Sequence, residues 1–221
     1  MLRCMSPSPS PTEPSRADRR LELLATFLLA LATLGTAWSA YQARQWTGEQ
    51  AKASTRATAK RIEVNRTAAV ANRQIQIDVA TFIEWVDATG HDDPRLATFY
   101  RQRFRDEFKP AFAAWLATKP LSTPGAPPTP FAMPQYQLES SKEADRIDVA
   151  AAADSATAAL SNDRANNYML AVVLFASSAF FAGVSTRLQA RNARIAILVL
   201  GCVLFLGTAF WLASMPVRVT T

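Results

Sequence analysis

Three long apolar stretches limit what this chain can fold into more than any other feature of its sequence. They cover residues 21–41, 168–186 and 195–213, and each is roughly 20 residues long. A helix of that length rises about 30 Å, which matches the hydrocarbon core of a bilayer. The sequence therefore predicts an all-α integral membrane protein with three transmembrane helices at these positions.

Arginines gather in two of the segments that flank these stretches. Four precede the first stretch and three lie between the second and the third: Arg3, Arg16, Arg19, Arg20, Arg187, Arg191 and Arg194. Short loops rich in Lys and Arg stay on the cytoplasmic side, whereas long domains translocate largely regardless of charge. The predicted topology therefore has a cytoplasmic tail at 1–20 and a cytoplasmic loop at 187–194. The long segment 42–167 and the tail 214–221 are predicted to be extracytoplasmic.

Aromatic residues support this topology independently. Trp and Tyr prefer the headgroup level of a bilayer, because their rings have an apolar body and a polar tip. Five of them lie at the end of the first stretch, the start of the second and the end of the third: Trp38, Tyr41, Trp46, Tyr168 and Trp211. All five are predicted to share one outer interface.

A cleaved signal peptide is the alternative interpretation of the first stretch. Basic residues precede it, and Ala37 and Ser39 are small enough for a cleavage site. The length of the apolar run, and its continuation into a helical pattern, favour an uncleaved helix. The tail before it is predicted to be disordered, because its Ser/Pro-rich part cannot bury a core.

Polar content inside the three stretches is low. No ionisable residue lies at their centres, which argues against a pump or a proton-coupled transporter. Small residues recur at positions that favour close helix packing: Gly35, Ser39, Ala179, Gly183, Gly201 and Gly207.

The extracytoplasmic segment is predicted to be helical, because its apolar residues recur at steps of three and four. We expect helices at about 42–88, 93–118 and 140–167, with a Pro-rich loop at 119–136. The first continues from the first apolar stretch, and the last runs into the second stretch without a break.

Local signals refine these helices. Asp93 is predicted to cap the middle helix and Pro94 to occupy its first turn. Pro110 is predicted to split that helix after Phe108. A capping box of Ser140 and Glu143 is predicted to start the last helix, and Gly48 is a candidate hinge just outside the membrane.

Side-chain size predicts how these helices pair. Residues 68–86 carry bulky apolar side chains and are expected to face the middle helix, whereas residues 51–67 are small and are expected to face the alanine-rich last helix. The middle helix offers one bulky stripe: Leu96, Phe99, Tyr100, Phe104, Phe108, Phe112 and Trp115.

We identify no catalytic, cofactor-binding or metal-binding residue in the sequence. His91 stands beside Asp92 and Asp93, but zinc sites need three or four ligands, so a helix start is the better interpretation. Basic residues of the middle helix alternate with acidic ones, which indicates a solvated face rather than an anion site: Arg101, Arg103, Arg105 and Lys109 against Asp106 and Glu107. Residues 42–165 contain 16 basic and 15 acidic residues, so no nucleic-acid partner is predicted.

Four segments together are similar to an uncharacterised family of bacterial membrane proteins with three spans and an extracytoplasmic helical region. They are residues 37–48, 108–118, 126–134 and 174–183, and the resemblance covers roughly residues 21–213. It implies a multi-pass protein of the bacterial inner membrane. The family motifs carry no known functional residue, so the resemblance implies no activity.

The sequence favours a membrane-anchored, non-enzymatic interaction or scaffold protein. Its expected partners are the lipid bilayer and either a second copy of the chain or another membrane protein. The alternative is an extracytoplasmic ligand-binding or sensor-like module coupled to the transmembrane helices, in which helix shifts would carry the signal.

Overall fold

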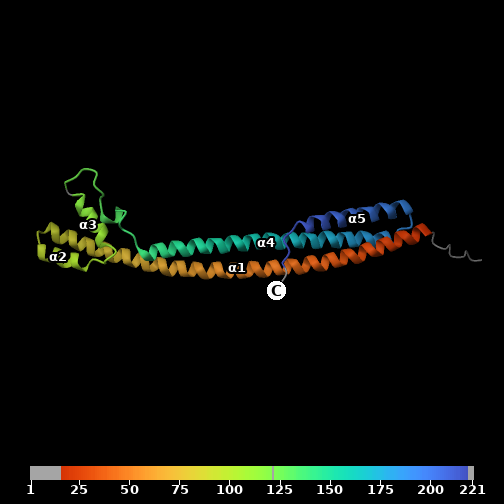
Figure 1. Ribbon diagram of the computed structural model, residues 1–221, viewed down its shortest axis with the longest axis horizontal. Coiled ribbons are helices and arrows are strands. Elements are labelled where there is room, and N and C mark those ends of the chain that lie inside the picture. The colour runs from red at the N-terminus through yellow and green to blue at the C-terminus, as the bar shows by residue number, and fades with distance from the viewer. Residues whose placement is uncertain (1–15, 121, 219–221) are drawn as a thin grey trace, which may run out of the picture. The chain divides into compact units, whose positions relative to one another are not determined.

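A computed structural model describes residues 16–120 and 122–218, and every regular element in this part of the chain is helical. The elements are α1 (Arg16–Gly90), α2 (Pro94–Arg103), α3 (Lys109–Ala117), the 3₁₀ helix η1 (Pro130–Ala132), α4 (Glu139–Ser185) and α5 (Arg191–Ala213) (Figure 1). The all-α prediction is therefore confirmed for the described residues. The predicted disorder of residues 1–15 falls outside them, whereas residues 16–20 of the predicted tail already belong to α1.

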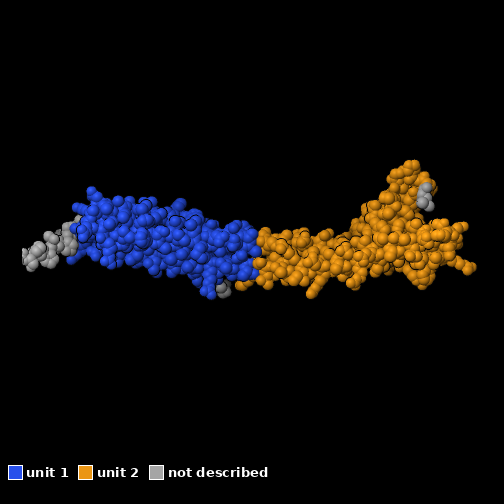
Figure 2. Space-filling model, turned by 180° about the vertical axis from the view of Figure 1, so that it is seen from behind, with its two compact units in different colours: residues 1–51, 158–221 blue, residues 52–157 orange. Residues whose placement is uncertain are grey.

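Three of these helices, α1, α4 and α5, are long and apolar enough to cross a membrane. The chain divides into two compact units (Figure 2). Unit 1 comprises residues 1–51 and 158–221 and contains all three apolar stretches, and unit 2 comprises residues 52–157. Because α1 and α4 are each continuous, both helices contribute to both units.

Unit 1 is held together by small residues that let its helices approach closely. Leu28 and Ala25 of α1 pack against Ala182 of α4 and Leu198 of α5. The hydroxyl of Ser178 donates to the backbone carbonyl of Gly201 at 2.8 Å. A Cβ added at Gly201 or at Gly35 would meet neighbouring atoms at 3.3 Å and 3.1 Å, respectively. Gly183 and Gly207 have open space instead, so only some of the predicted small residues serve helix packing.

The aromatic residues of unit 1 do not all face outward. Trp38 and Tyr41 are each 45% exposed. Trp46 and Tyr168 are buried in a cluster with Ala43 and Ala165, against which Leu212 and Met215 pack. The Tyr168 hydroxyl donates to the Pro216 carbonyl at 3.1 Å. These two rings therefore pack between helices within unit 1.

In unit 2, α1 and α4 run antiparallel along a line of residues that are mostly alanine. Its buried members are Ala53, Ala57 and Ala71 of α1 with Ala144, Ile147 and Ala151 of α4. Asp154 of α4 accepts from Arg56 at 3.2 Å and pairs with Lys60 at 2.8 Å, so two cations of α1 hold one carboxylate of α4. The expected pairing of the small half of α1 with the alanine-rich helix is confirmed.

The bulky half of α1 also has its expected partner. Phe82 forms a buried cluster with Phe104, Phe108, Phe112 and Trp115. Aromatic rings meet edge-on at several of these contacts, an arrangement that their quadrupoles favour.

The predicted middle helix is split, but the break is wider than a point after Phe108. Helix α2 ends at Arg103, Phe104 leaves the helical conformation, and α3 begins at Lys109 with Pro110 in its first turn. Proline fits a first turn, where its missing N–H costs nothing. Leu96 and Phe99, on α2, are 40% and 45% exposed, so they lie outside the aromatic core, contrary to prediction.

Of the two predicted helix starts, one is confirmed and one is wrong. Asp93 caps α2 as predicted, because its carboxylate accepts from the N–H groups of Arg95 and Leu96. Ser140 does not cap α4, which begins at Glu139. Its hydroxyl donates instead to the side chain of Gln74 at 2.7 Å, so a contact between helices replaces the local cap.

Candidate functional site

Unit 2 contains an apolar groove of about 700 Å³ between the end of α1, the end of α3 and the Pro-rich loop. Three aromatic rings, two aliphatic side chains and two prolines make up most of its lining. The lining residues are Phe82, Trp85, Val86, Thr89, Gly90, Trp115, Leu116, Lys119, Pro120, Ser122 and Pro128.

The walls of this groove are fixed by the aromatic core behind them. Phe82 meets Trp115 edge-on with ring centroids 5.4 Å apart, and Trp85 meets Phe112 edge-on at 4.8 Å. The indole N–H of Trp115 donates to the Pro127 carbonyl at 2.8 Å, which fastens the Pro-rich loop to α3. The groove is therefore built from packed side chains rather than from a loose surface.

Lys119 is the one charged residue among those that line the groove. It follows α3 with a backbone φ of 51°, in the left-handed region that side chains seldom adopt. No ion pair joins its ammonium group to another residue of the described chain. An apolar groove with one unpaired cation at its edge suits an occupant that is largely apolar and carries one carboxylate.

One turn before Phe82 on α1 lies a buried carboxylate, Asp78, whose side chain is fully inaccessible. Its Oδ2 accepts from the Arg105 guanidinium at 2.9 Å and from the Tyr136 hydroxyl at 3.0 Å. Its Oδ1 is buried without a hydrogen-bond partner among the described residues. Arg105 also contacts the Glu107 carboxylate.

The environment of Asp78 shifts its proton affinity. Burial raises the pKa of Asp78 above its ordinary value, and the hydrogen bond from Tyr136 and the charge of Arg105 oppose this only in part. Burial likewise raises the pKa of Tyr136, with the Asp78 carboxylate adding to the effect. This cluster joins α1, the α2–α3 connection and the Pro-rich loop, so it positions the walls of the groove.

The sequence did not reveal this cluster. Arg105 was expected on a solvated face, but only 22% of its side chain is exposed, because the non-helical turn after Arg103 directs it toward α1. The position of Asp78 in the sequence does indicate that it is buried. It stands seven residues after Ala71 and four before Phe82, and this spacing places it on the buried face of α1.

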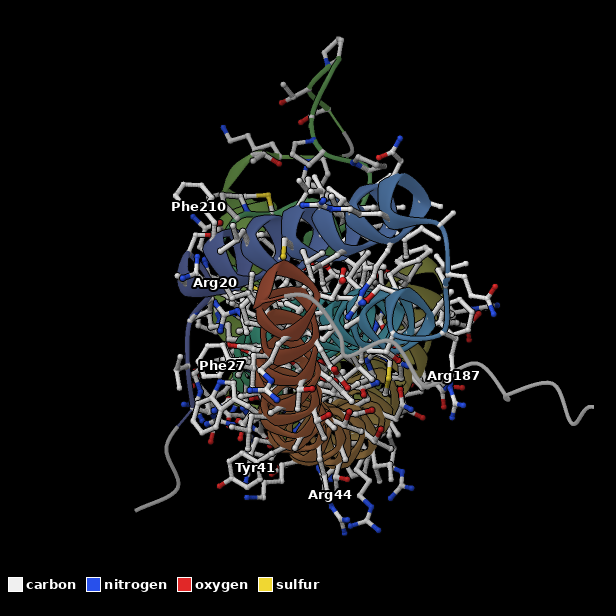
Figure 3. The ribbon with its side chains drawn as sticks, turned by 90° about the vertical axis from the view of Figure 1, so that its right-hand side faces the viewer. Arg20, Phe27, Tyr41, Arg44, Arg187 and Phe210 are labelled. Atoms are coloured by element: carbon white, nitrogen blue, oxygen red, sulfur yellow. The ribbon has the colours of Figure 1, made fainter. Side chains whose placement is uncertain are left out.

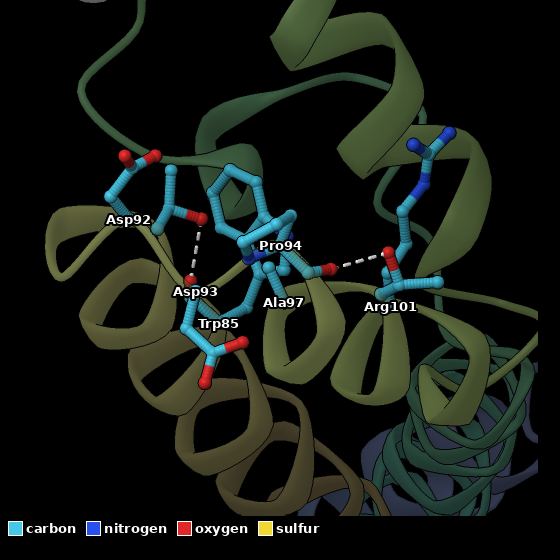
Figure 4. Close-up of a pocket in the computed structure, with 8 residues that line it drawn as sticks. Trp85, Asp92, Asp93, Pro94, Ala97 and Arg101 are labelled. Atoms are coloured by element: carbon cyan, nitrogen blue, oxygen red, sulfur yellow. Dashed lines mark hydrogen bonds between the residues drawn. The ribbon is translucent and has the colours of Figure 1, made fainter.

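A second, smaller hollow of about 240 Å³ lies where α1 meets α2. Figure 4 shows Asp92 and Arg101 on opposite sides of it, with Trp85 and Pro94 between them. Its lining residues are Trp85, Thr89, Asp92, Asp93, Pro94, Ala97, Thr98 and Arg101. Asp93 is already engaged as the cap of α2, and His91 is exposed with its Nδ1 3.0 Å from the Asp87 carbonyl oxygen. No group of three metal-binding side chains occurs within the described residues.

Comparisons with protein-family models, with curated proteins and with solved structures find no match for this chain. The function is therefore argued from the geometry of the groove.

Proposed function

We propose that this protein is a membrane-anchored interaction protein without catalytic activity, which captures a partner through the groove of unit 2. Three helices with the length and composition of membrane spans support the anchor. The arginines at the start of α1, in the α4–α5 connection and in the first turn of α5 support a cytoplasmic N-terminus, with residues 42–167 and the C-terminus outside. The bacterial inner membrane is part of the proposal.

The groove is the observation that carries this proposal. A volume of about 700 Å³ holds several side chains, and its apolar lining favours burial of apolar groups. Lys119 adds charge complementarity for one acidic group. The proposed occupant is a segment of a protein partner with two or three apolar side chains and a nearby Asp, Glu or terminal carboxylate.

The chemistry of the lining supports binding rather than catalysis. General acid–base catalysis needs positioned groups that give and accept a proton near the reacting atoms. Lys119 is the one titratable side chain among the groove residues, and Asp78 is buried away from solvent. In this proposal the Asp78 carboxylate has a structural role, because it holds Arg105 and Tyr136 in place beside the groove.

Site-specific photo-crosslinking tests the proposal directly. A photoreactive amino acid is placed at Val86, which lines the groove and is 45% exposed, and in a matched variant at Val70 of the same helix, which is 49% exposed. We expect a protein adduct of one defined mass from position 86 and none from position 70. Sequencing of the crosslinked peptide should give an apolar segment with an acidic residue, and Lys119→Glu should suppress the adduct.

Equal adducts from both positions, or an adduct insensitive to Lys119→Glu, would contradict the proposal. An adduct with a second copy of this chain at position 86 would identify the occupant as another molecule of the same protein.

The second candidate function, a ligand-binding or sensor-like module, is favoured by the mixture of apolar walls and one cation, which also suits a small amphipathic carboxylate. That candidate predicts an adduct of small-molecule mass at position 86.

A further inference from the structure

Arginines from two distant parts of the chain lie at the same end of unit 1, where α1 and α5 begin. Arg20 belongs to the first turns of α1, and Arg194 belongs to the first turn of α5. The guanidinium of Arg194 donates to the backbone carbonyl of Asp18 at 3.4 Å, which joins the two helix starts. Just beyond this contact, Leu21 and Ala25 of α1 pack in the same cluster as Leu198 of α5.

These arginines have no anionic partner among the described residues. No ion pair joins Arg19, Arg20, Arg187, Arg191 or Arg194 to another described residue. The Nε of Arg194 is buried and has no hydrogen-bond partner among the described residues. Guanidinium groups without an ion-pair partner favour binding of an external anion, and their forked donors suit phosphate.

An apolar cleft of about 210 Å³ opens between α1 and α5 one turn deeper than these two arginines. Leu24 follows Arg20 by four residues, and Leu198 follows Arg194 by four, so each arginine stands above the cleft on its own helix face. All of the residues that line the cleft are apolar: Leu24, Phe27, Leu28, Leu31, Leu198, Cys202, Phe205 and Leu206.

The other arginines of this end are placed differently. Figure 3 looks at the end of unit 1 where α1 begins, and shows Arg20, Phe27 and Phe210 on one side with Arg187 on the other. Arg187 is exposed and belongs to the α4–α5 connection rather than to the cleft. It therefore serves as a matched control of equal charge.

We infer that Arg20, Arg194 and the cleft below them bind one anionic phospholipid, with its phosphate on the two guanidinium groups and an acyl chain in the cleft. The cleft lies between α1 and α5, which are both long and apolar enough to cross a membrane. In a membrane, an anionic lipid supplies both a phosphate for the arginines and an acyl chain for the cleft. Free phosphate would use the arginines alone and leave the cleft empty.

Native mass spectrometry of the purified full chain in mild detergent tests this inference, because orientation in a membrane does not affect it. Phosphatidylglycerol is titrated against the protein, with phosphatidylcholine and inorganic phosphate as separate probes. We expect retained phosphatidylglycerol in preference to phosphatidylcholine, and roughly tenfold or greater weakening in Arg20→Gln/Arg194→Gln. Arg187→Gln should bind as the wild type does.

A second variant separates the cleft from the charges. Cys202→Trp fills the cleft and leaves both arginines in place, so it should weaken phosphatidylglycerol binding and leave any binding of inorganic phosphate unchanged. Circular dichroism confirms that each variant keeps its helix content. Equal weakening by Arg187→Gln, equal binding of the two lipids, or full binding by Cys202→Trp would overturn the inference.

Discussion

The side-chain amide of Gln42 and the backbone of Arg218 exchange two hydrogen bonds, each 3.0 Å long. Gln42 is fully buried on α1, and Arg218 lies in the segment that follows α5. The Arg218 guanidinium also bonds the Glu49 carboxylate at 2.7 Å and lies 5.2 Å from the centre of the Trp46 ring. These contacts fasten the chain after α5 to α1 within unit 1.

Gln42→Ala should release this segment. The substitution removes both hydrogen bonds, each of which contributes about 1 kcal/mol, and leaves the Arg218 N–H without its acceptor. We expect hydrogen exchange of the Arg218 amide to become on the order of tenfold faster or more. Gln45→Ala, on the same helix, is the control, and unchanged protection of Arg218 in Gln42→Ala would show that other contacts hold the segment.

The buried pair of Asp78 and Arg105 gives a second prediction. Removing Arg105 leaves the Asp78 carboxylate buried without its cation, so Arg105→Met alone should destabilise the protein by about 3–5 kcal/mol. Asp78→Leu should cost less, because Arg105 is 22% exposed and keeps its ion pair with Glu107. The double variant Asp78→Leu/Arg105→Met removes both charges and should recover a large part of that loss. Chemical denaturation of the full chain measures all three variants.

The exposed ion pair of Lys109 and Asp106 is the control for this cycle. Its carboxylate is 96% exposed, so solvent screens it and Asp106→Leu should have no measurable effect on stability. If the losses from the two single variants simply added in the double variant, Asp78 and Arg105 would not depend on each other as described.

The pH dependence of stability follows from the raised pKa of Asp78. The native state binds this proton more tightly than the unfolded chain, in which the ordinary value is 3.8. The tighter proton binding of Asp78 therefore makes its largest contribution to the free energy of unfolding below pH 3.8. This contribution declines as the pH rises from there through the raised native pKa. Above that pKa the contribution is constant.

Asp78→Asn isolates this effect, because asparagine does not titrate. The stability of the wild type minus that of the variant should fall with rising pH across this window and then become flat. Subtraction is needed because Glu143 and Asp154 have lowered pKa values and give slopes of the opposite sign. A difference that rises with pH would contradict the assigned burial of Asp78.

The helices were largely predictable from the sequence, because apolar residues recur at steps of three and four positions over many turns of each long helix. The end of α1 at Gly90 and the cap at Asp93 follow from local chemistry that a sequence displays. The break at 104–108 was harder to locate, because Pro110 indicates where a helix starts but not where the preceding one stops.

The groove could not be predicted for a different reason. Its lining comes from two helices and a loop whose path depends on distant contacts, such as the bond from Trp115 to the Pro127 carbonyl. Similarly, interleaved charges around Arg105 looked like a solvated surface, since no local pattern shows that a turn directs one of them to Asp78.

Helix packing in unit 1 gives the last prediction, for which α5 provides its own control. A Cβ at Gly201 would already lie 3.3 Å from the Ser178 carbonyl oxygen and from the Phe181 Cβ, whereas Gly207 has open space. Gly201→Leu should therefore push α5 away from α4 and cost about 1–3 kcal/mol or more through overpacking. Gly207→Leu gains the same helix propensity without a clash, so it should be neutral or slightly stabilising. Thermal denaturation in detergent compares the two variants, and equal unfolding temperatures would mean that α4 and α5 do not meet at Gly201.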